Sequence, residues 1–191
     1  MFMDWLPEIN VHSDKQYKKF LRKAYYQAWK RSDDNSTKIG SIITLPDLSK
    51  MISYGVDHFP KDILITEYLL QDKEWKYQNM LTATEDAIAK AKKTKYSLKK
   101  AVLVMNWLPW IEQGKQIVNA GIETVIGHKQ FVERTPEEYQ EKIILGIEYL
   151  LENKIQVSLY DGIIHKWPDK WSGGGLWKPT KSILKGVEWR P

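Results

Sequence analysis

The chain has 191 residues, with 29 Lys and Arg against 24 Asp and Glu, a formal net charge of +5, nine Trp and no Cys. Its composition, with 42% hydrophobic and 28% charged residues, is typical of one globular domain, with or without an appendage. This composition argues against disorder, collagen-like repeats and a coiled coil. No apolar run approaches the roughly 18 residues that span a bilayer, and residues 1–7 lack the order of a signal peptide. We therefore expect an intracellular, cytoplasmic protein without a membrane partner. The absence of Cys excludes disulfides, thiol nucleophiles and every zinc site that needs a thiolate.

The end of the chain differs in composition from the rest. Residues 165–191 contain six basic side chains against two acidic ones and so carry +4 of the net charge of +5. The same segment holds four of the nine Trp and three consecutive Gly, at positions 173–175. We therefore predict a domain over residues 1–164 and a basic, Trp- and Gly-rich C-terminal arm over residues 165–191.

The first predicted helix begins at a capping box. Ser13 and Gln16 stand three residues apart, the spacing at which the two side chains cap backbone N–H groups at the start of a helix. Apolar residues then recur at intervals of three and four, which places them on one face of a helix that ends near Arg31. These residues are Tyr17, Phe20, Leu21, Ala24, Tyr25 and Ala28.

Two runs rich in β-forming residues follow a polar turn. Residues 39–45 and 51–54 are separated by Pro46 and Asp47, and this pattern predicts an antiparallel hairpin. Residues 61–80 mix an apolar stretch with a charged one, and there we expect a helix and a connector.

A second capping box opens the middle of the chain. Thr82 and Glu85 have the required spacing, and the apolar pattern after them predicts a helix that ends at about Lys93. Residues 101–105 are entirely apolar, which predicts a buried strand.

The remaining segments alternate between helix and strand. Pro109 is suited to the first turn of a helix that Gly121 ends, and residues 122–126 are the next strand. Residues 135–138, T-P-E-E, begin another helix, and residues 155–160 form a last strand. The order α-β-β-α-β-α-β-α-β predicts a three-layer α-β-α domain around a mixed sheet of about five strands, part of it parallel.

Three segments share their wording with a known enzyme family. Residues 31–43 read R-S-D-D-N-S-T-K-I-G-S-I-I, residues 55–60 read G-V-D-H-F-P, and residues 115–122 read K-Q-I-V-N-A-G-I. They resemble the phrases R-S-x-D-x-x-T-x-V-G-A-x-I, G-x-N-x-x-P and A-K-x-I-x-N-A-G-I of the zinc-dependent nucleoside and nucleotide deaminases, and among them the deoxycytidylate deaminases most closely. The resemblance covers roughly residues 13–160 and implies a cytidine-deaminase-like sandwich.

The same resemblance locates the family's catalytic positions, and here they hold other residues. Family members bind zinc through the His of H-A-E and the two Cys of P-C-x-x-C, and the Glu of H-A-E moves protons. In this chain the His position is Thr82, the Glu position is Thr84, and the two Cys positions after Pro109 are Trp110 and Gln113. We therefore expect no metal, no cofactor and no zinc-dependent deamination.

Neighbouring residues do not restore the lost groups. Glu85 and Asp86 follow Thr84, but one residue along a helix is a rotation of about 100°, and the capping box already employs Glu85. The four histidines lie in separate segments without paired ligand spacing, which favours structural or surface roles over a new metal site. They are His12, His58, His128 and His165.

A nucleotide pocket can be kept in a protein that lacks the metal ligands. The resemblance implies contacts to the sugar and phosphate from the loop after the first helix, from residues 57–60 and from residues 106–110. The resulting nucleotide-binding candidates are Ser32, Asp33, Thr37, Asp57, His58, Asn106, Trp107 and Trp110.

Three of these candidates bear on how a nucleotide would bind. The indoles of Trp107 and Trp110 either stack on a base, at about 1–3 kcal/mol per base, or fill the space of the zinc, and the sequence leaves both interpretations open. Asp57 stands where the family has a substrate-contacting Asn, and its charge would repel a phosphate. A bound nucleotide would then differ from dCMP in orientation or in its number of phosphates.

Three functions follow from these observations. The favoured hypothesis is a catalytically inactive deaminase-like protein that binds a nucleotide or a protein partner, in a regulatory, sequestering or assembly role. The second is an enzyme with a different reaction on a pyrimidine nucleotide or modified base, for which the candidate residues are Asp57, His58, Glu85, Asp86 and Glu112. The third is a nucleic-acid-binding module that uses the arm.

The arm itself allows two interpretations. Its Trp and Lys residues suit stacking on single-stranded nucleic acid and neutralisation of phosphates. Trp is more often retained for burial, however, and this favours packing of the arm on its own domain or on a neighbouring subunit. Because deoxycytidylate deaminases commonly assemble, the resemblance also implies a homo-oligomer.

Overall fold

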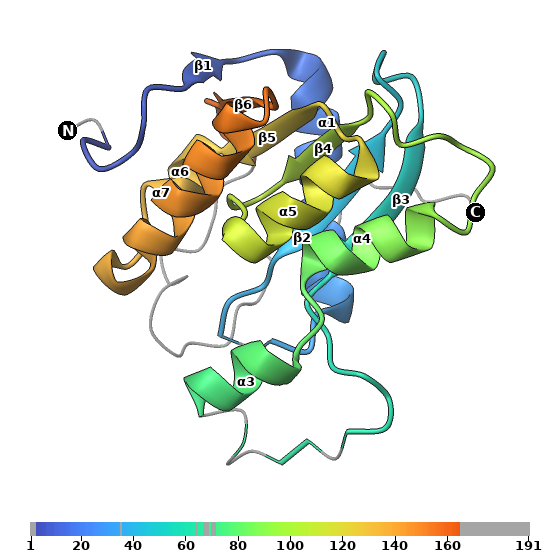
Figure 1. Ribbon diagram of the computed structural model, residues 1–191, viewed down its shortest axis with the longest axis vertical. Helices are drawn as coiled ribbons and strands as arrows, with labels where there is room; N and C mark the ends of the chain where they lie inside the picture. The colour runs from blue at the N-terminus through green and yellow to red at the C-terminus, as the bar shows by residue number, and fades with distance from the viewer. Residues whose placement is uncertain (1–2, 35, 64, 67–68, 70–71, 165–191) are drawn as a thin grey trace.

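The computed structural model describes residues 3–164, except residues 35, 64, 67–68 and 70–71 (Figure 1). The predicted arm at residues 165–191 lies outside the described residues, and its role therefore stays a prediction. In the described part, no helix is both long and apolar enough to cross a membrane.

A six-stranded mixed sheet forms the centre of the described chain. In spatial order its strands are β1 (Asn10–His12), β6 (Gln156–Tyr160), β5 (Thr124–His128), β4 (Val102–Met105), β2 (Gly40–Thr44) and β3 (Met51–Val56). The strands from β1 to β4 in this order pair in parallel, whereas β2 pairs antiparallel with both β4 and β3. The predicted mixed sheet and its hairpin are confirmed. The sixth strand, β1, was not predicted because three residues are too few for a visible alternation of apolar and polar side chains.

Helices cover both faces of the sheet (Figure 1). They are α1 (Lys15–Arg31), α3 (Lys73–Asn79), α4 (Ala83–Ala91), α5 (Ile111–Ala120), the short α6 (Lys129–Val132) and α7 (Glu137–Glu152). Gly40 and Gly55 show how closely two of them approach. A Cβ on Gly40 would collide with the carbonyl oxygen of Ala24 in α1, and one on Gly55 with that of Ala83 in α4. Because Gly55 pairs with Ser41, the neighbour of Gly40, the two glycines face opposite sides of the sheet. The predicted α-β-α layering is confirmed.

Of the four predicted helix starts, two hold and two shift. Residues 135–138 begin α7, whose N-cap is Pro136. Thr82 and Glu85 form the expected capping box of α4. The N-cap of α1 is Asp14, not Ser13, because the Asp14 carboxylate accepts the Gln16 N–H at 2.9 Å. Pro109 does not lie in the first turn of α5, since the N-cap of this helix is Trp110.

Two further predictions concern the ends of helices and strands. Gly121 ends α5 in the left-handed conformation, with φ at 79°, as expected for a C-terminal glycine. The four residues of β4 are all buried, as the apolar run at residues 101–105 predicted. This central strand positions the segment that leads into α5, and α5 in turn borders the site described next.

Candidate functional site

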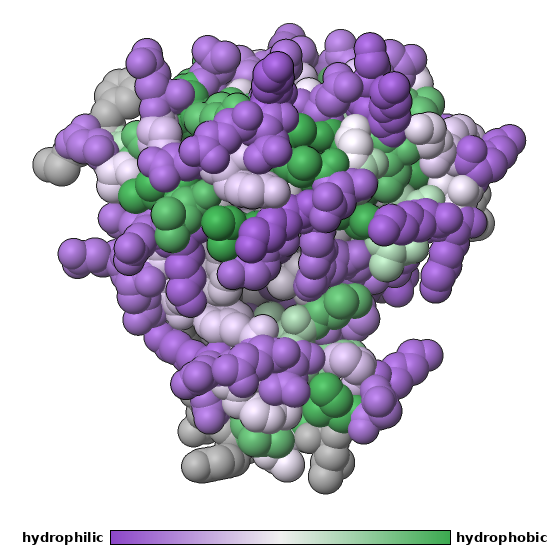
Figure 2. Space-filling model, viewed as in Figure 1, coloured by the Kyte–Doolittle hydropathy of each residue, from purple (hydrophilic) through white to green (hydrophobic). Residues whose placement is uncertain are grey.

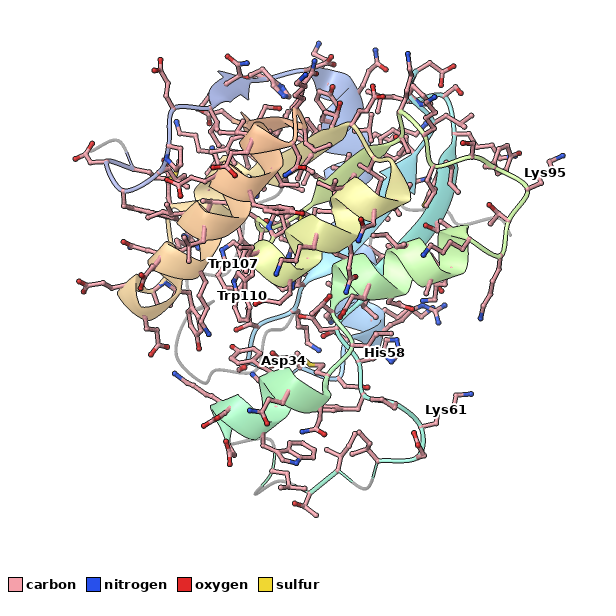
Figure 3. All side chains as sticks on the ribbon, in the orientation of Figure 1. Asp34, His58, Lys61, Lys95, Trp107 and Trp110 are labelled. Carbon is pink, nitrogen blue, oxygen red and sulfur yellow. The ribbon has the colours of Figure 1, made fainter. Side chains whose placement is uncertain are left out.

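The four positions to which the resemblance assigns the zinc ligands and the catalytic Glu come together in space. Thr82, Thr84, Trp110 and Gln113 all line one cavity of about 40 Å³ at the N-terminal ends of α4 and α5. Other polar or aromatic residues in its wall are Asp34, Thr37, Asp57, Tyr77 and Trp107. Figure 3 shows the labelled Asp34, Trp107 and Trp110 on the side of the sheet domain that faces α3. Of the eight predicted nucleotide-binding residues, the cavity thus collects Thr37, Asp57, Trp107 and Trp110.

Trp110 and Gln113 serve the start of α5. The backbone N–H of Trp110 donates to Gln113 Oε1 at 3.2 Å, so the amide takes up a group that has no partner within the helix. The indole of Trp110 stacks on the ring of Tyr139, with centroids 5.9 Å apart and planes 12° apart. It also meets Tyr77 edge-on at 5.2 Å. The two positions therefore supply a helix cap and part of an aromatic cluster.

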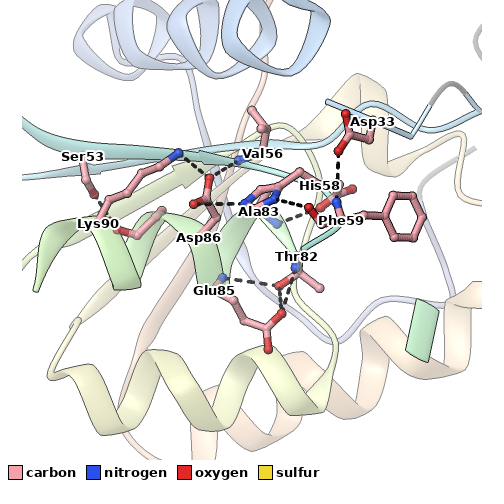
Figure 4. Close-up of polar contacts among 12 residues, drawn as sticks. Asp33, Ser53, Val56, His58, Phe59, Thr82, Ala83, Glu85, Asp86 and Lys90 are labelled. Atoms are coloured by element: carbon pink, nitrogen blue, oxygen red, sulfur yellow. Dashed lines mark hydrogen bonds and ion pairs between the residues drawn. The ribbon is translucent and has the colours of Figure 1, made fainter. Parts of the chain in front are cut away.

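Thr82 and Thr84 have contrasting surroundings at the start of α4. Thr82 exchanges hydrogen bonds with Glu85, whose Oε2 accepts the Thr82 N–H at 2.8 Å (Figure 4). The other carboxylate oxygen of Glu85 accepts from Gln116. The hydroxyl of Thr84, by contrast, is buried and has no hydrogen-bond partner among the residues that the structure describes.

These residues do not fit a zinc ion. Zinc in proteins prefers thiolate, imidazole and carboxylate ligands, whereas these four positions offer two hydroxyls, an indole and an amide whose oxygen already caps a helix. The carboxyl groups of Asp34 and Asp57 also line the cavity, but Asp34 pairs with Lys76 and Asp57 accepts the Ala83 N–H. Over the described ranges, no group of three or more His, Cys, Asp or Glu side chains is arranged to hold a metal ion.

The histidines lie elsewhere. His128 is buried, with Nδ1 2.6 Å from the Tyr25 hydroxyl and Nε2 3.0 Å from the carbonyl oxygen of Gly162. Burial lowers the pKa of His128 to about 4. His12 Nε2 lies 3.1 Å from the Ser158 hydroxyl. His165 lies outside the described residues.

His58 does not line the cavity but joins a polar cluster beside it. His58 Nε2 lies 3.3 Å from Asp86 Oδ1, and the other oxygen of Asp86 accepts from Lys90 at 2.6 Å and from the Val56 N–H at 3.2 Å (Figure 4). The sequence offered five candidate residues for an enzyme with a different reaction. Of these five, all in the described part of the chain, only Asp57 lines the cavity.

Asp57 is a buried acid at the N-terminus of α4. Its Oδ1 accepts the Ala83 N–H at 2.7 Å. Burial, and then the nearby charge of Asp34, raise the pKa of Asp57 well above its ordinary value. A raised pKa shifts the carboxyl towards its neutral form, which repels a phosphate less than a carboxylate does.

The loop after α1 is held by its own carboxylates. Asp34 Oδ1 accepts the N–H groups of Ser36 and Thr37 at 2.8 and 3.1 Å. Asp34 Oδ2 lies 2.9 Å from Lys76 Nζ of α3, and the two side chains are only 3% and 4% exposed. The sequence reasoning missed this ion pair. The R-S-x-D phrase marked Asp34, but no local pattern pointed to Lys76.

Three other predicted residues also have structural contacts instead of lining the cavity. Asp33 Oδ2 accepts the Phe59 N–H at 3.0 Å, and Ser32 Oγ accepts the Asp34 N–H at 3.2 Å. Asn106 is fully buried, and its amide joins the Gly40 N–H to the Lys38 carbonyl oxygen, both at 2.9 Å. These side chains shape the loops around the site.

A wider groove lies outside the cavity, between α3 and α7. Its volume is about 440 Å³, and its lining residues are Lys73, Glu74, Tyr77, Gln78, Glu138, Tyr139 and Lys142. Tyr77 belongs to both the groove and the cavity. Lys142 Nζ lies 4.7 Å from the ring centre of Trp110. Figure 2 shows hydrophilic side chains along the boundary between α3 and the rest of this face.

Similar solved structures are deaminases. No protein-family model and no curated protein sequence matches the chain. The dCMP deaminase of cyanophage S-TIM5 in apo form is 17% identical over 76% of this chain and 98% of its own, with a TM-score of 0.56. Its complex with dCMP and dUMP is 18% identical over 78% of this chain and 99% of its own, with a TM-score of 0.57.

A bifunctional enzyme has a similar domain. The diaminohydroxyphosphoribosylaminopyrimidine deaminase/5-amino-6-(5-phosphoribosylamino)uracil reductase of Thermotoga maritima is 19% identical, over 76% of this chain and 36% of that one, with a TM-score of 0.56. At these identities the likeness concerns the fold. The chain thus has the CMP/dCMP deaminase-like fold that its sequence segments predicted.

Proposed function

We propose that the chain is a catalytically inactive deaminase-like protein that binds a nucleotide or a protein partner, in a regulatory, sequestering or assembly role. One observation carries the proposal. The residues at the four catalytic positions line a single cavity, so the scaffold brings them together, yet they are Thr82, Thr84, Trp110 and Gln113.

The cavity supports inactivity by its chemistry. Hydrolytic deamination needs an activated water and a group that transfers protons, and the hydroxyl of Thr84 cannot replace a carboxylate in that role. The carboxyl of Asp57 also lines the cavity, but it already accepts the Ala83 N–H at 2.7 Å.

The outer groove supports nucleotide binding. Its volume of about 440 Å³ falls within the roughly 300–1,000 Å³ of small-molecule sites. The rings of Tyr77 and Tyr139 offer surfaces for a base, and the ammonium group of Lys142 offers a partner for a phosphate. Lys73, also in the groove, is already paired with Glu138 at 2.7 Å. A similar fold has been solved with dCMP and dUMP bound, which favours a nucleotide of this kind as the ligand.

Thermal unfolding in the presence of nucleoside mono-, di- and triphosphates tests the binding. A ligand at a hundred times its Kd adds about 2.7 kcal/mol of stability. We expect at least one nucleotide to raise the melting temperature, and Lys142→Ala to reduce this shift. Lys115→Ala, which changes an exposed Lys on α5, is the matched control. If no nucleotide changes the melting temperature, nucleotide binding is contradicted, and binding of a protein partner is the alternative that remains.

Metal analysis and an activity assay test the inactivity. Purified protein should contain less than one zinc per chain and should not convert dCMP to dUMP. One tightly bound zinc per chain, or deamination of dCMP, would contradict the proposal directly.

The proposal includes a homo-oligomer, which the resemblance implies. Sedimentation of the full chain, and of a chain without residues 165–191, tests whether assembly depends on the arm. If the arm instead confers salt-sensitive binding to an oligonucleotide, the nucleic-acid-binding hypothesis gains support.

A further inference from the structure

Thr84 presents a buried hydroxyl that nothing in the described chain satisfies. The residue is 1% exposed, and its Oγ1 has no hydrogen-bond partner among the described residues. Burying a hydroxyl without a partner costs free energy, and most buried polar atoms in folded proteins are therefore satisfied by protein or by ordered water.

The cavity that Thr84 lines has room for such a partner. Its volume of about 40 Å³ exceeds the roughly 10–15 Å³ that a cavity needs to hold a water molecule. Asp57 uses Oδ1 for the Ala83 N–H, which leaves its second oxygen available to a molecule in the cavity. Gln113 uses Oε1 for the Trp110 N–H, which leaves its NH₂ group available as a donor. The wall thus offers a hydroxyl, a carboxyl oxygen and an amide donor.

We propose that ordered water fills this cavity and bridges Thr84 Oγ1 to Asp57 and Gln113, as the polar centre of the fold at the position where related deaminases bind zinc. A buried water needs two to four polar partners, and these three side chains supply them. The proposal goes beyond the proposed function because it does not depend on which ligand or partner the protein binds.

A cation is a poorer occupant than water. The charge of Asp34 is already neutralised by Lys76, whose Nζ lies 2.9 Å from Asp34 Oδ2. The cavity also borders the N-terminus of α4, which carries the positive end of the helix dipole and disfavours a positive ion. Burial raises the pKa of Asp57, so this carboxyl favours its neutral form, which needs no counter-ion.

High-resolution crystallography of the full chain tests the proposal directly. We expect water density within about 3.2 Å of Thr84 Oγ1. Thr84→Val keeps the shape of the side chain and removes its hydroxyl, and we expect it to lose that water and to lower the melting temperature by about 2–4 °C. Thr84→Ser keeps the hydroxyl and should retain the water, which separates the loss of a hydrogen bond from a failure to fold.

Two results would overturn the proposal. An empty cavity together with a higher melting temperature for Thr84→Val would show that the hydroxyl is buried without compensation. A melting temperature that depends on whether the buffer contains sodium, potassium, ammonium or choline chloride at equal ionic strength, and that loses this dependence in Asp57→Asn, would assign the cavity to a cation. Neither result bears on nucleotide binding, which the thermal shifts measure separately.

Discussion

The turn at residues 32–37 and the paired starts of α4 and α5 both border the cavity, but their polar side chains have different surroundings. In the turn, Asp34 accepts hydrogen bonds from Ser36 and Thr37 and pairs with Lys76. At the helix starts, the capping groups are paired in the same way, yet the Thr84 hydroxyl has no partner in the described chain. The turn resembles the corresponding deaminase phrase, whereas the residues at the helix starts differ from the family's H-A-E and P-C-x-x-C motifs. In both regions the groups that hold the backbone are paired, and the hydroxyl without a partner in the described chain lies where the resemblance places the catalytic Glu.

The largest effect is expected when the family's zinc ligands and catalytic Glu are introduced at the two helix starts. The variant Thr82→His, Thr84→Glu, Trp110→Cys and Gln113→Cys should bind one zinc per chain, because the scaffold already places these four positions around one cavity. Zinc bound by a complete ligand set stabilises small proteins by on the order of 10 kcal/mol. Elemental analysis after dialysis against a weak chelator measures this. The same variant without the two Cys is the control, and absence of zinc from the full variant would show that the helix starts have moved apart.

Removing Lys76 should have the next largest effect. Lys76→Met leaves the Asp34 carboxylate buried and unpaired, and breaking a buried ion pair typically costs about 3–5 kcal/mol. Lys73→Met is the matched control, because Lys73 lies on the same helix as Lys76. It pairs with Glu138 of α7, and both side chains of that pair are more than half exposed. Such exposed pairs contribute about 0–1 kcal/mol. Urea denaturation measures both free energies of unfolding, and equal losses would contradict the role of burial.

His128 extends the comparison to a buried polar group that does not line the cavity. Its pKa is lowered from 6.5 to about 4 in the folded chain, so the unfolded chain binds more protons between these values. Stability should therefore fall as the pH drops from about 6.5 towards 4, by up to about 3 kcal/mol.

The pH dependence is measured by urea denaturation at a series of pH values. Asp57 acts in the opposite direction, because its raised pKa favours folding at low pH. In His128→Asn, the free energy of unfolding should change less with pH between 6.5 and 4, or should rise as the pH falls. An unchanged pH dependence of the free energy of unfolding in that variant would show that His128 does not control it.

The smallest expected effect concerns the capping box of α4. Thr82→Ala removes the hydroxyl that accepts the Glu85 N–H, and loss of an N-cap costs about 1 kcal/mol. Glu85→Gln, which keeps a side-chain acceptor for the Thr82 N–H, should cost less. Chemical denaturation compares the two, and a neutral Thr82→Ala would mean that the start of α4 is held by the Asp57–Ala83 contact alone.

The sequence allowed most of the fold to be predicted because its signals are local. Capping boxes, apolar runs and the Gly121 helix end each act over a few residues, and the structure confirms their placement in α4, β4 and α5. The exceptions have physical causes. β1 is too short for a periodic pattern, and at the start of α1 two adjacent residues, Ser13 and Asp14, are both good N-caps.

The site could be predicted only where a residue could be aligned with a family motif. Thr84 and Trp110 were located at positions of the H-A-E and P-C-x-x-C motifs, and both line the cavity. Tyr77 and Tyr139 line the cavity or its groove from α3 and α7, and Lys76 of α3 pairs with Asp34 in the cavity wall. Their contribution depends on how these helices pack against the rest of the fold, and no spacing within the chain encodes it.

The hydrogen bond between the Trp110 N–H and Gln113 has a consequence for how this sequence can change. The side chains at both positions now stabilise the start of α5, one through the aromatic cluster and one through the cap. A single change of either residue to Cys would remove a stabilising contact, at about 1 kcal/mol for a cap, without completing a zinc site. A stepwise route from this sequence to two Cys ligands at these positions therefore passes through less stable intermediates.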